Sequence, residues 1–212
     1  MEKIIRTSRS RLKIAEEIIN SATHGVGAVA GIIGLTLGVL TLAAPKAFTI
    51  GFLLYCICLI TLMTVSALYH AMIFTRFKHI FRMLDHSGIF LLIAGTYTPF
   101  AITLYSGWAQ FALLAVIWTI AIGGILFRIT LPKFMSRFSM GIYLAMGWLA
   151  LVFIPKLHLL PAQVIWLVAA GGLLYTMGAA LLAIKKPFIH VAWHIFVVAA
   201  AVLHFFAITK LA

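Results

Sequence analysis

The chain has 212 residues, of which 64% are hydrophobic and only 9% are charged, and its formal net charge is +12. A soluble domain of this size has no means of burying so much apolar surface, so the composition excludes a soluble globular protein and indicates a lipid environment. In a soluble protein the positive charge would suggest nucleic-acid binding. Here Lys and Arg lie mainly between apolar runs, as in loops that face anionic lipid head groups, so we expect no nucleic-acid partner.

The first predicted element is a short amphipathic helix over residues 1–22. Leu12, Ala15 and Ile19 follow helical spacing, and most of the charged side chains fall elsewhere on the helical wheel. This pattern is typical of a helix that lies in the membrane interface. The sequence therefore predicts an N-terminal interfacial helix that leads into a transmembrane domain at 23–212.

Seven long apolar runs follow, and each has about the ~20 residues that a helix needs to cross a bilayer. They cover approximately 24–44, 48–70, 83–104, 108–127, 138–155, 160–184 and 189–209. The interruptions between them are short and carry turn residues or charges, so no second, soluble domain is expected. We predict an all-α membrane protein, a seven-transmembrane helix bundle in the cell membrane.

The distribution of basic residues predicts the orientation of this bundle. Most Lys and Arg residues fall on one set of alternating connections: the N-terminal arm, Arg76 to Arg82, Arg128 to Arg137, and Lys185-Lys186. The opposite side receives only Lys46, Lys156 and Lys210. Because cytoplasmic loops are enriched in Lys and Arg, we expect a cytoplasmic N-terminus and an external C-terminus.

Two histidines stand at the head of the last apolar run, in the sequence HVAWH at His190 to His194. On a helix this spacing turns through roughly 400°, so both imidazoles leave the same face one turn apart. Such a pair can supply two ligands to one metal ion. A chance pattern in a chain with eight histidines is the alternative interpretation.

The predicted topology brings further polar residues to the same depth of the membrane. The second run ends on the cytoplasmic side with Ser66 and His70, and the third begins there with Asp85. Together with His190 and His194, these residues form a candidate site in the cytoplasmic leaflet. Random placement would scatter polar residues along the spans.

A zinc site with an open position is one interpretation of this convergence. His70, His190 and His194 would supply three nitrogens to Zn²⁺, and the fourth position would hold water, as catalytic sites require. Asp85, the one aspartate of the chain, could hold or deprotonate the water, and Ser66 could hydrogen-bond the water or an oxyanion. The alternative interpretation of Asp85 is a structural role: an acid at the N-terminus of a helix interacts favourably with the helix macrodipole or with a neighbouring Arg.

The first span begins with another set of polar residues on one helical face. Glu17, Asn20 and His24 follow i, i+3 and i+7 spacing. They are candidates for residues that support the metal ligands, or for a helix-capping network.

Several separated motifs in order resemble the hemolysin III family, the bacterial branch of the superfamily of progestin and adipoQ receptors. They are ExxNxxxHxxG at Glu17–Gly27, SxxxH at Ser66–His70, LDHSGIF at Leu84–Phe90, GTYTPF at Gly95–Phe100 and HxxxH at His190–His194. The resemblance implies a seven-helix membrane protein with zinc in the cytoplasmic leaflet. It implies the same three histidines as ligands, with Asp85 beside the bound water and Ser66 nearby.

The resemblance leaves three functions open. The wider superfamily is similar to alkaline ceramidases, which implies a zinc-dependent hydrolase acting on a lipid amide or ester. The family name implies a pore-forming cytolysin, and a link to membrane homeostasis implies a non-catalytic regulator with structural zinc. Membrane lipids are the expected partners, one of them a candidate substrate, and the sequence does not predict the oligomeric state.

Overall fold

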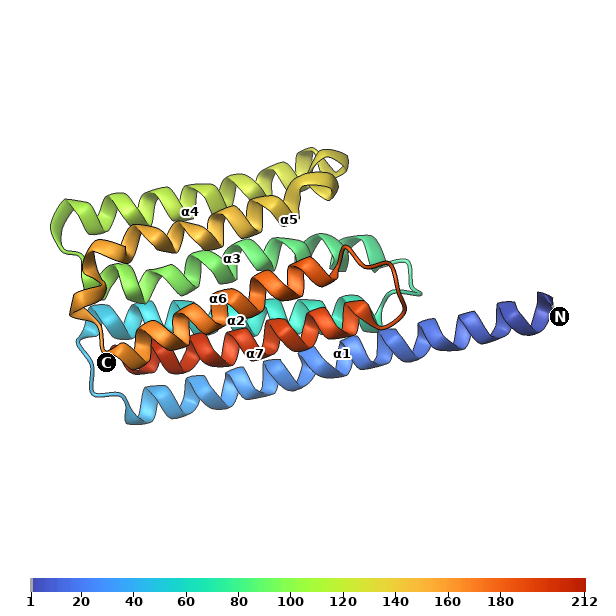
Figure 1. Ribbon diagram of the computed structural model, residues 1–212, viewed down its shortest axis with the longest axis horizontal. Coiled ribbons are helices and arrows are strands. Elements are labelled where there is room, and N and C mark those ends of the chain that lie inside the picture. The colour runs from blue at the N-terminus through green and yellow to red at the C-terminus, as the bar shows by residue number, and fades with distance from the viewer. Residues whose placement is uncertain (1) are drawn as a thin grey trace.

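Seven helices that are long and apolar enough to cross a membrane make up the computed structural model. It describes residues 2–212, with side chains described at 11–135 and 137–212. The predicted all-α, seven-helix fold is confirmed (Figure 1). The elements are α1 (Glu2–Thr41), α2 (Lys46–Ala71), α3 (Lys78–Leu104), α4 (Gly107–Thr130), α5 (Pro132–Trp148), the 3₁₀ helix η1 (Leu149–Leu159), α6 (Ala162–Leu181) and α7 (Ile189–Thr209).

The predicted loop at Arg128 to Arg137 is wrong, because most of this segment is helical. α4 extends to Thr130 and α5 begins at Pro132. Proline is well tolerated at the first position of a helix, where its missing N–H leaves no helical hydrogen bond unmade. The charges in this segment therefore lie on helix ends, and one of them becomes important at the candidate site.

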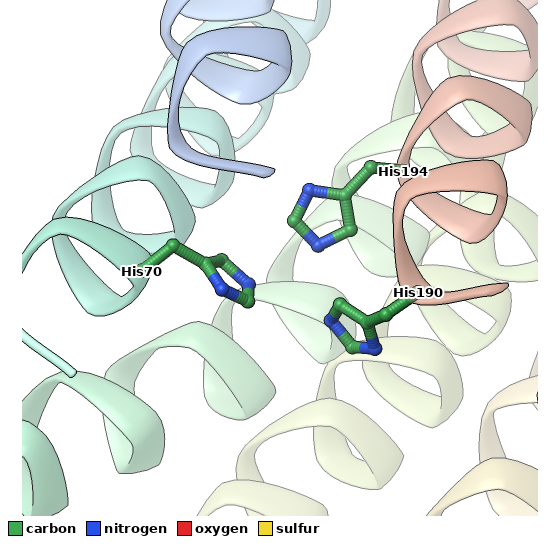
Figure 2. Close-up of side chains that lie close together, drawn as sticks. All are labelled: His70, His190 and His194. Carbon is green, nitrogen blue, oxygen red and sulfur yellow. The ribbon is translucent and has the colours of Figure 1, made fainter. Parts of the chain in front are cut away.

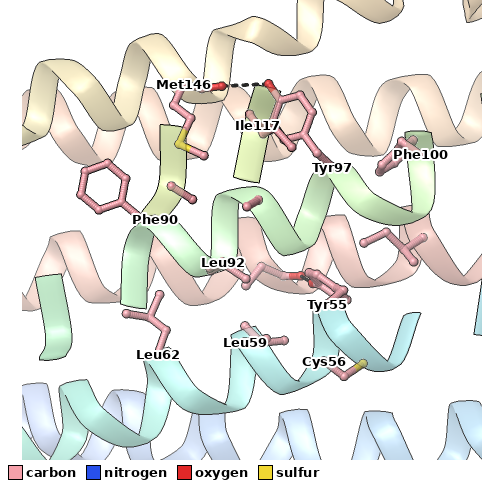
Figure 3. Packing of buried hydrophobic residues seen from close by; sticks show 14 of the residues in the cluster. Tyr55, Cys56, Leu59, Leu62, Phe90, Leu92, Tyr97, Phe100, Ile117 and Met146 are labelled. Atoms are coloured by element: carbon pink, nitrogen blue, oxygen red, sulfur yellow. Dashed lines mark hydrogen bonds between the residues drawn. The ribbon is translucent and has the colours of Figure 1, made fainter. Parts of the chain in front are cut away.

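α2 and α3 form the centre of the bundle. α3 is the most deeply buried span, and α2 packs extensively against both α3 and α1. Figure 1 shows α4 and α5 together along one edge, with α1 along the opposite edge. Apolar residues of α2 and α3 pack between these layers: Leu59 and Leu62 of α2 are turned toward α3, whereas Phe90 of α3 is turned to the other side, where its ring meets Tyr143 of α5 (Figure 3).

The outer surface of the bundle carries many large apolar side chains. Leu40 is 76% exposed and Phe111 is 69% exposed, and many other large aliphatic side chains are also exposed. In water this surface would be strongly unfavourable, whereas in a bilayer it contacts acyl chains. The surface and the seven spans define a multi-pass integral membrane protein.

Glycines allow two of the helix contacts to be close. A Cβ atom on Gly34 of α1 would lie 2.9 Å from the ring of Phe205 on α7. A Cβ atom on Gly171 of α6 would lie 2.5 Å from the imidazole of His204, also on α7. Small residues therefore permit close helix contacts on both sides of α7.

α1 is continuous, with no break at the predicted boundary after residue 22. Its 40 residues extend over about 60 Å, roughly twice the hydrocarbon thickness of a bilayer. Its N-terminal part projects beyond the other helices (Figure 1), and the two chain ends lie at opposite ends of the molecule. An interfacial position for residues 1–22 stays a prediction, and Met1 lies outside the described residues.

The face that α1 turns toward the bundle is polar around Asn20 and His24, and it continues with small residues such as Ala28. Leu12, Ile18 and Ile19 are exposed, while Asn20 and His24 are buried. In a lipid solvent the inward face of a helix is the one with polar groups to satisfy. The polar residues of α1 are thereby directed at the ends of α2 and α7.

Candidate metal centre

Three histidines from two helices meet at the end of the bundle from which α1 projects. His70 lies in the last turn of α2, and His190 and His194 occupy the first two turns of α7. Figure 2 shows the three imidazoles turned toward one another. One ring nitrogen from each lies within 4.8 Å of the other two.

Glu17 of α1 fixes the orientation of the His70 ring. His70 Nδ1 donates a hydrogen bond to Glu17 Oε2 across 2.6 Å, and this contact joins α1 to α2 at the site. The opposite nitrogen, His70 Nε2, is buried and has no hydrogen-bond partner among the described residues. A carboxylate on one nitrogen and a free lone pair on the other is the usual arrangement of a metal-ligating histidine.

His194 is held in the same manner by the backbone of α1. Its Nδ1 donates to the carbonyl oxygen of Asn20 across 3.3 Å, which leaves Nε2 as the hydrogen-bond acceptor. The His24 ring stacks on the His194 ring with centroids 3.7 Å apart and planes 12° from parallel. The three residues predicted to support the ligands, Glu17, Asn20 and His24, therefore all lie beside them.

Two of these supporting side chains keep unused polar atoms. Both ring nitrogens of His24 and the Oδ1 atom of Asn20 are buried without a hydrogen-bond partner among the residues described here. Glu17, Asn20 and His24 lie within the continuous helix α1, so no helix begins at these residues for them to cap. The His24 side chain instead contacts α7.

Asp85 and Ser66 lie next to the histidine cluster without belonging to it. The Asp85 carboxyl lies close to the Ser66 hydroxyl and to the His70 ring. Ser66 Oγ is buried and completes no hydrogen bond within the described part of the chain. The structure thus places a carboxylate and a hydroxyl beside the three ring nitrogens, with the carboxylate outside the ligand set.

Arg128 is a component of this region that the sequence reasoning missed. It was predicted to lie in a loop, but its side chain is only 5% exposed in the last turn of α4, where it faces Tyr143 and Asp85. Its Nη1 atom has no hydrogen-bond partner among the described residues. The signal was present in the sequence, because Arg128 stands alone within the apolar stretch ILFRIT.

Glu16 is a second residue that the sequence reasoning missed. Its Oε1 atom accepts a hydrogen bond of 3.0 Å from the backbone N–H of Phe188, the residue before α7. Phe188 has φ of 63°, an uncommon conformation for a residue with a side chain. Neighbouring carboxylates of α1 therefore hold the start of α7 and the end of α2, the two segments that carry the histidines.

The donor set fits a zinc ion. Zinc accepts three imidazole nitrogens and one further ligand in tetrahedral geometry, and at Zn–N distances near 2.0–2.1 Å the nitrogens lie about 3.4 Å apart. The observed nitrogens lie within 4.8 Å of one another, so binding of the ion would draw them closer together. The unpartnered Nε2 of His70 is the strongest indication, since a buried imidazole nitrogen without a partner is unfavourable.

An apolar cavity of about 470 Å³ begins next to this site. Its lining includes Leu62, one helical turn before Ser66 on α2, and Ile89, one turn after Asp85 on α3. From there it extends between α3, α5, η1, α6 and α7 toward the other end of the bundle. Cavities of this size with an apolar lining are typical of binding sites for apolar ligands.

These features define an integral membrane protein of seven helices with a candidate metal centre at one end and an apolar cavity beside it. A family model described as haemolysin-III related matches residues 12–205. The chain belongs to the haemolysin III-related family, which confirms the resemblance of the sequence motifs.

Curated relatives support the same assignment. The chain is 39% identical to Hemolysin-3 of Bacillus cereus over 203 residues, covering 92% of this chain and 91% of that protein. It is 35% identical to the Hemolysin-3 homolog of Bacillus subtilis (strain 168) over 199 residues, covering 92% and 93%. It is also 27% identical to the monocyte to macrophage differentiation factor of Homo sapiens over 159 residues, covering 72% of this chain and 66% of that protein.

Proposed function

We propose that this protein is a zinc-dependent hydrolase that cleaves an amide or ester bond of a lipid at the cytoplasmic leaflet of the cell membrane. The observation that carries the proposal is the Nε2 atom of His70, which has no hydrogen-bond partner among the residues that the structure describes. It is buried, faces His190 and His194, and lies beside a carboxylate that is not a ligand.

His70, His190 and His194 would hold the zinc ion. Bound there, zinc would supply a Lewis acid that polarises the scissile carbonyl group and makes hydroxide available near neutral pH. Glu17 keeps the proton of His70 on Nδ1, so that Nε2 keeps its lone pair for the metal. The role of α1 is therefore to fix the ring that α2 contributes.

We assign the proton transfer to Asp85 and the hydrogen bond to the scissile carbonyl group to Ser66. The Asp85 carboxylate accepts a proton from the attacking water and returns it to the leaving amine or alcohol. The Ser66 hydroxyl, which has no partner among the described residues, donates a hydrogen bond to the oxygen of the scissile carbonyl. Arg128 Nη1 is available to an anionic group of the lipid head.

The apolar cavity supports a lipid as the substrate. It begins one helical turn from Ser66 and from Asp85, so a molecule whose polar head reaches the site can place its tail inside the bundle. The lining is made of aliphatic and aromatic side chains from α3, α5, η1, α6 and α7. This arrangement suits an acyl chain and does not suit a water-soluble substrate.

A non-catalytic regulator with structural zinc would use the same three ligands. The placement of Asp85 and Ser66 next to the ligands favours catalysis, because structural zinc sites have four protein ligands and no open position. The name Hemolysin-3 of the Bacillus cereus relative refers to hemolysis. No observation on this chain favours a pore over a hydrolase, since its cavity is lined mostly by apolar side chains.

The test compares zinc content and lipid hydrolysis in two variants. His194→Ala should lose both zinc and fatty-acid release from a panel of lipid amides and esters. Asp85→Asn should keep zinc and lose fatty-acid release, because the aspartate is not a ligand. Zinc-loaded wild-type protein that releases no fatty acid from any member of the panel would refute a hydrolase, and the non-catalytic regulator would replace it.

A further inference from the structure

The apolar cavity contains hydroxyl groups, and within the described part of the chain all except one of them donate to a backbone carbonyl oxygen. Thr96, Thr176, Tyr97 and Tyr143 each donate to a backbone carbonyl oxygen, at distances between 2.7 and 2.9 Å. Tyr175 also lines the cavity, and no hydrogen bond of its hydroxyl occurs within the described part of the chain. It therefore differs from the other hydroxyl groups of the lining.

His204 stands beside Tyr175 with one ring nitrogen free. Its Nε2 donates to the carbonyl oxygen of Val168 across 3.3 Å, so Nδ1 carries the lone pair. Nδ1 has no partner among the described residues. The ring packs on Gly171, where a Cβ atom would lie 2.5 Å away, so α6 makes room for an imidazole at the cavity.

The two side chains form one polar subsite. The rings of Tyr175 and His204 meet edge to face with centroids 5.5 Å apart, and they come from adjacent helices, α6 and α7. Tyr175 offers an O–H donor and His204 Nδ1 offers an acceptor. A hydroxyl group in the cavity that reaches both atoms can accept from the first and donate to the second.

This subsite lies well away from the metal centre. His204 is about 15 Å further along α7 than His194. A lipid whose head is at the three histidines would place the distal part of its tail, and not its head, beside Tyr175 and His204. We propose that Tyr175 and His204 bind a hydroxyl group on the acyl chain of the lipid, so that the protein selects hydroxylated chains.

The selectivity follows from the energetics of buried polar groups. An unsubstituted chain would cover the Tyr175 hydroxyl and His204 Nδ1 without replacing their hydrogen bonds, which is unfavourable in an apolar cavity. A hydroxylated chain satisfies both. A site that hydrogen-bonds a ligand hydroxyl discriminates strongly against the same ligand without that hydroxyl. This discrimination is larger than the one an apolar pocket makes between ligands that differ by one methylene group. The inference rests on the proposed function in one respect, namely that the cavity holds a lipid tail.

The experiment uses the full-length protein in lipid nanodiscs and a fluorescent fatty acid as the probe. Two competitors displace the probe: a saturated fatty acid, and the same acid with one hydroxyl group in the distal half of its chain. Wild-type protein should bind the hydroxylated acid about tenfold more tightly. Tyr175→Phe should abolish that preference, and His204→Leu should do the same.

Tyr97→Phe is the matched control. Tyr97 lines the same cavity, but its hydroxyl already donates to the carbonyl oxygens of Met146 and Gly147, so the variant should keep the preference. Thermal unfolding of each variant in nanodiscs verifies that it is folded.

Three results would overturn the inference. They are equal binding of the two acids by wild-type protein, an unchanged preference in both Tyr175→Phe and His204→Leu, or failure of either acid to displace the probe. Repeating the assay with His194→Ala separates this question from the proposed function. If His194→Ala still prefers the hydroxylated acid, the subsite is supported even though the variant hydrolyses no lipid. The loss of hydrolysis then reports on the metal centre alone.

Discussion

Replacement of Glu17 by Gln tests the idea that α1 orients a metal ligand of α2. In the wild-type protein Glu17 Oε2 lies 2.6 Å from His70 Nδ1, and the two side chains are only 12% and 3% exposed. A hydrogen bond to a charged group contributes about 1.5–3 kcal/mol, and about 1.4 kcal/mol corresponds to a tenfold change in affinity. The amide keeps the shape and loses the charge, so we expect zinc affinity to fall by about 10- to 100-fold.

The measurement is zinc affinity by competition with a chelator, on detergent-purified protein at fixed pH. Glu16→Gln is the matched control, because it removes the same charge from the neighbouring residue, which contacts Phe188 and not a histidine. Its zinc affinity should fall less than that of Glu17→Gln. Wild-type zinc affinity in the Glu17 variant, or an equal loss in both variants, would refute a specific role for Glu17 in orienting His70.

Three further predictions follow from the same geometry. His194→Ala should remove the rise in thermal stability that added zinc gives the wild-type protein, and an undiminished rise would show that the ion binds elsewhere. Arg128→Met should leave the unfolding temperature unchanged or raise it, because the buried guanidinium has an unsatisfied N–H, and a strong loss of stability would mean that the charge is compensated in the fold. Gly171→Ala should cost about 1–3 kcal/mol because its Cβ would meet the His204 ring, whereas Gly172→Ala, with nothing within 4 Å, should be nearly neutral in the same unfolding assay.

The amino-acid sequence determined the fold class and the geometry inside single helices. The number and length of the apolar runs require helices that satisfy their own backbone groups in lipid, which leads to seven spans. The predicted run at 189–209 coincides with α7. Within it, His190 and His194 share a face because the rotation per residue of a helix is fixed.

The distribution of charges also identified the end of the bundle where the polar residues gather. His70 and Asp85 were expected at the same depth as the histidine pair, and the structure places them together. Depth in a membrane follows from chain position along a span, so it is available from the sequence. The side of the membrane on which this end lies stays a prediction from the Lys and Arg distribution.

Only the tertiary structure decided how the helices are rotated about their axes and which neighbours they meet. It turned the polar face of α1 inward, joined Glu17 to His70, buried Arg128 and placed His204 on a cavity beside Tyr175. These relations depend on side-chain packing between helices that are distant in sequence, where spacing along one helix carries no information. In lipid, moreover, apolar residues are favourable on either face, so hydrophobic periodicity alone does not identify the buried side.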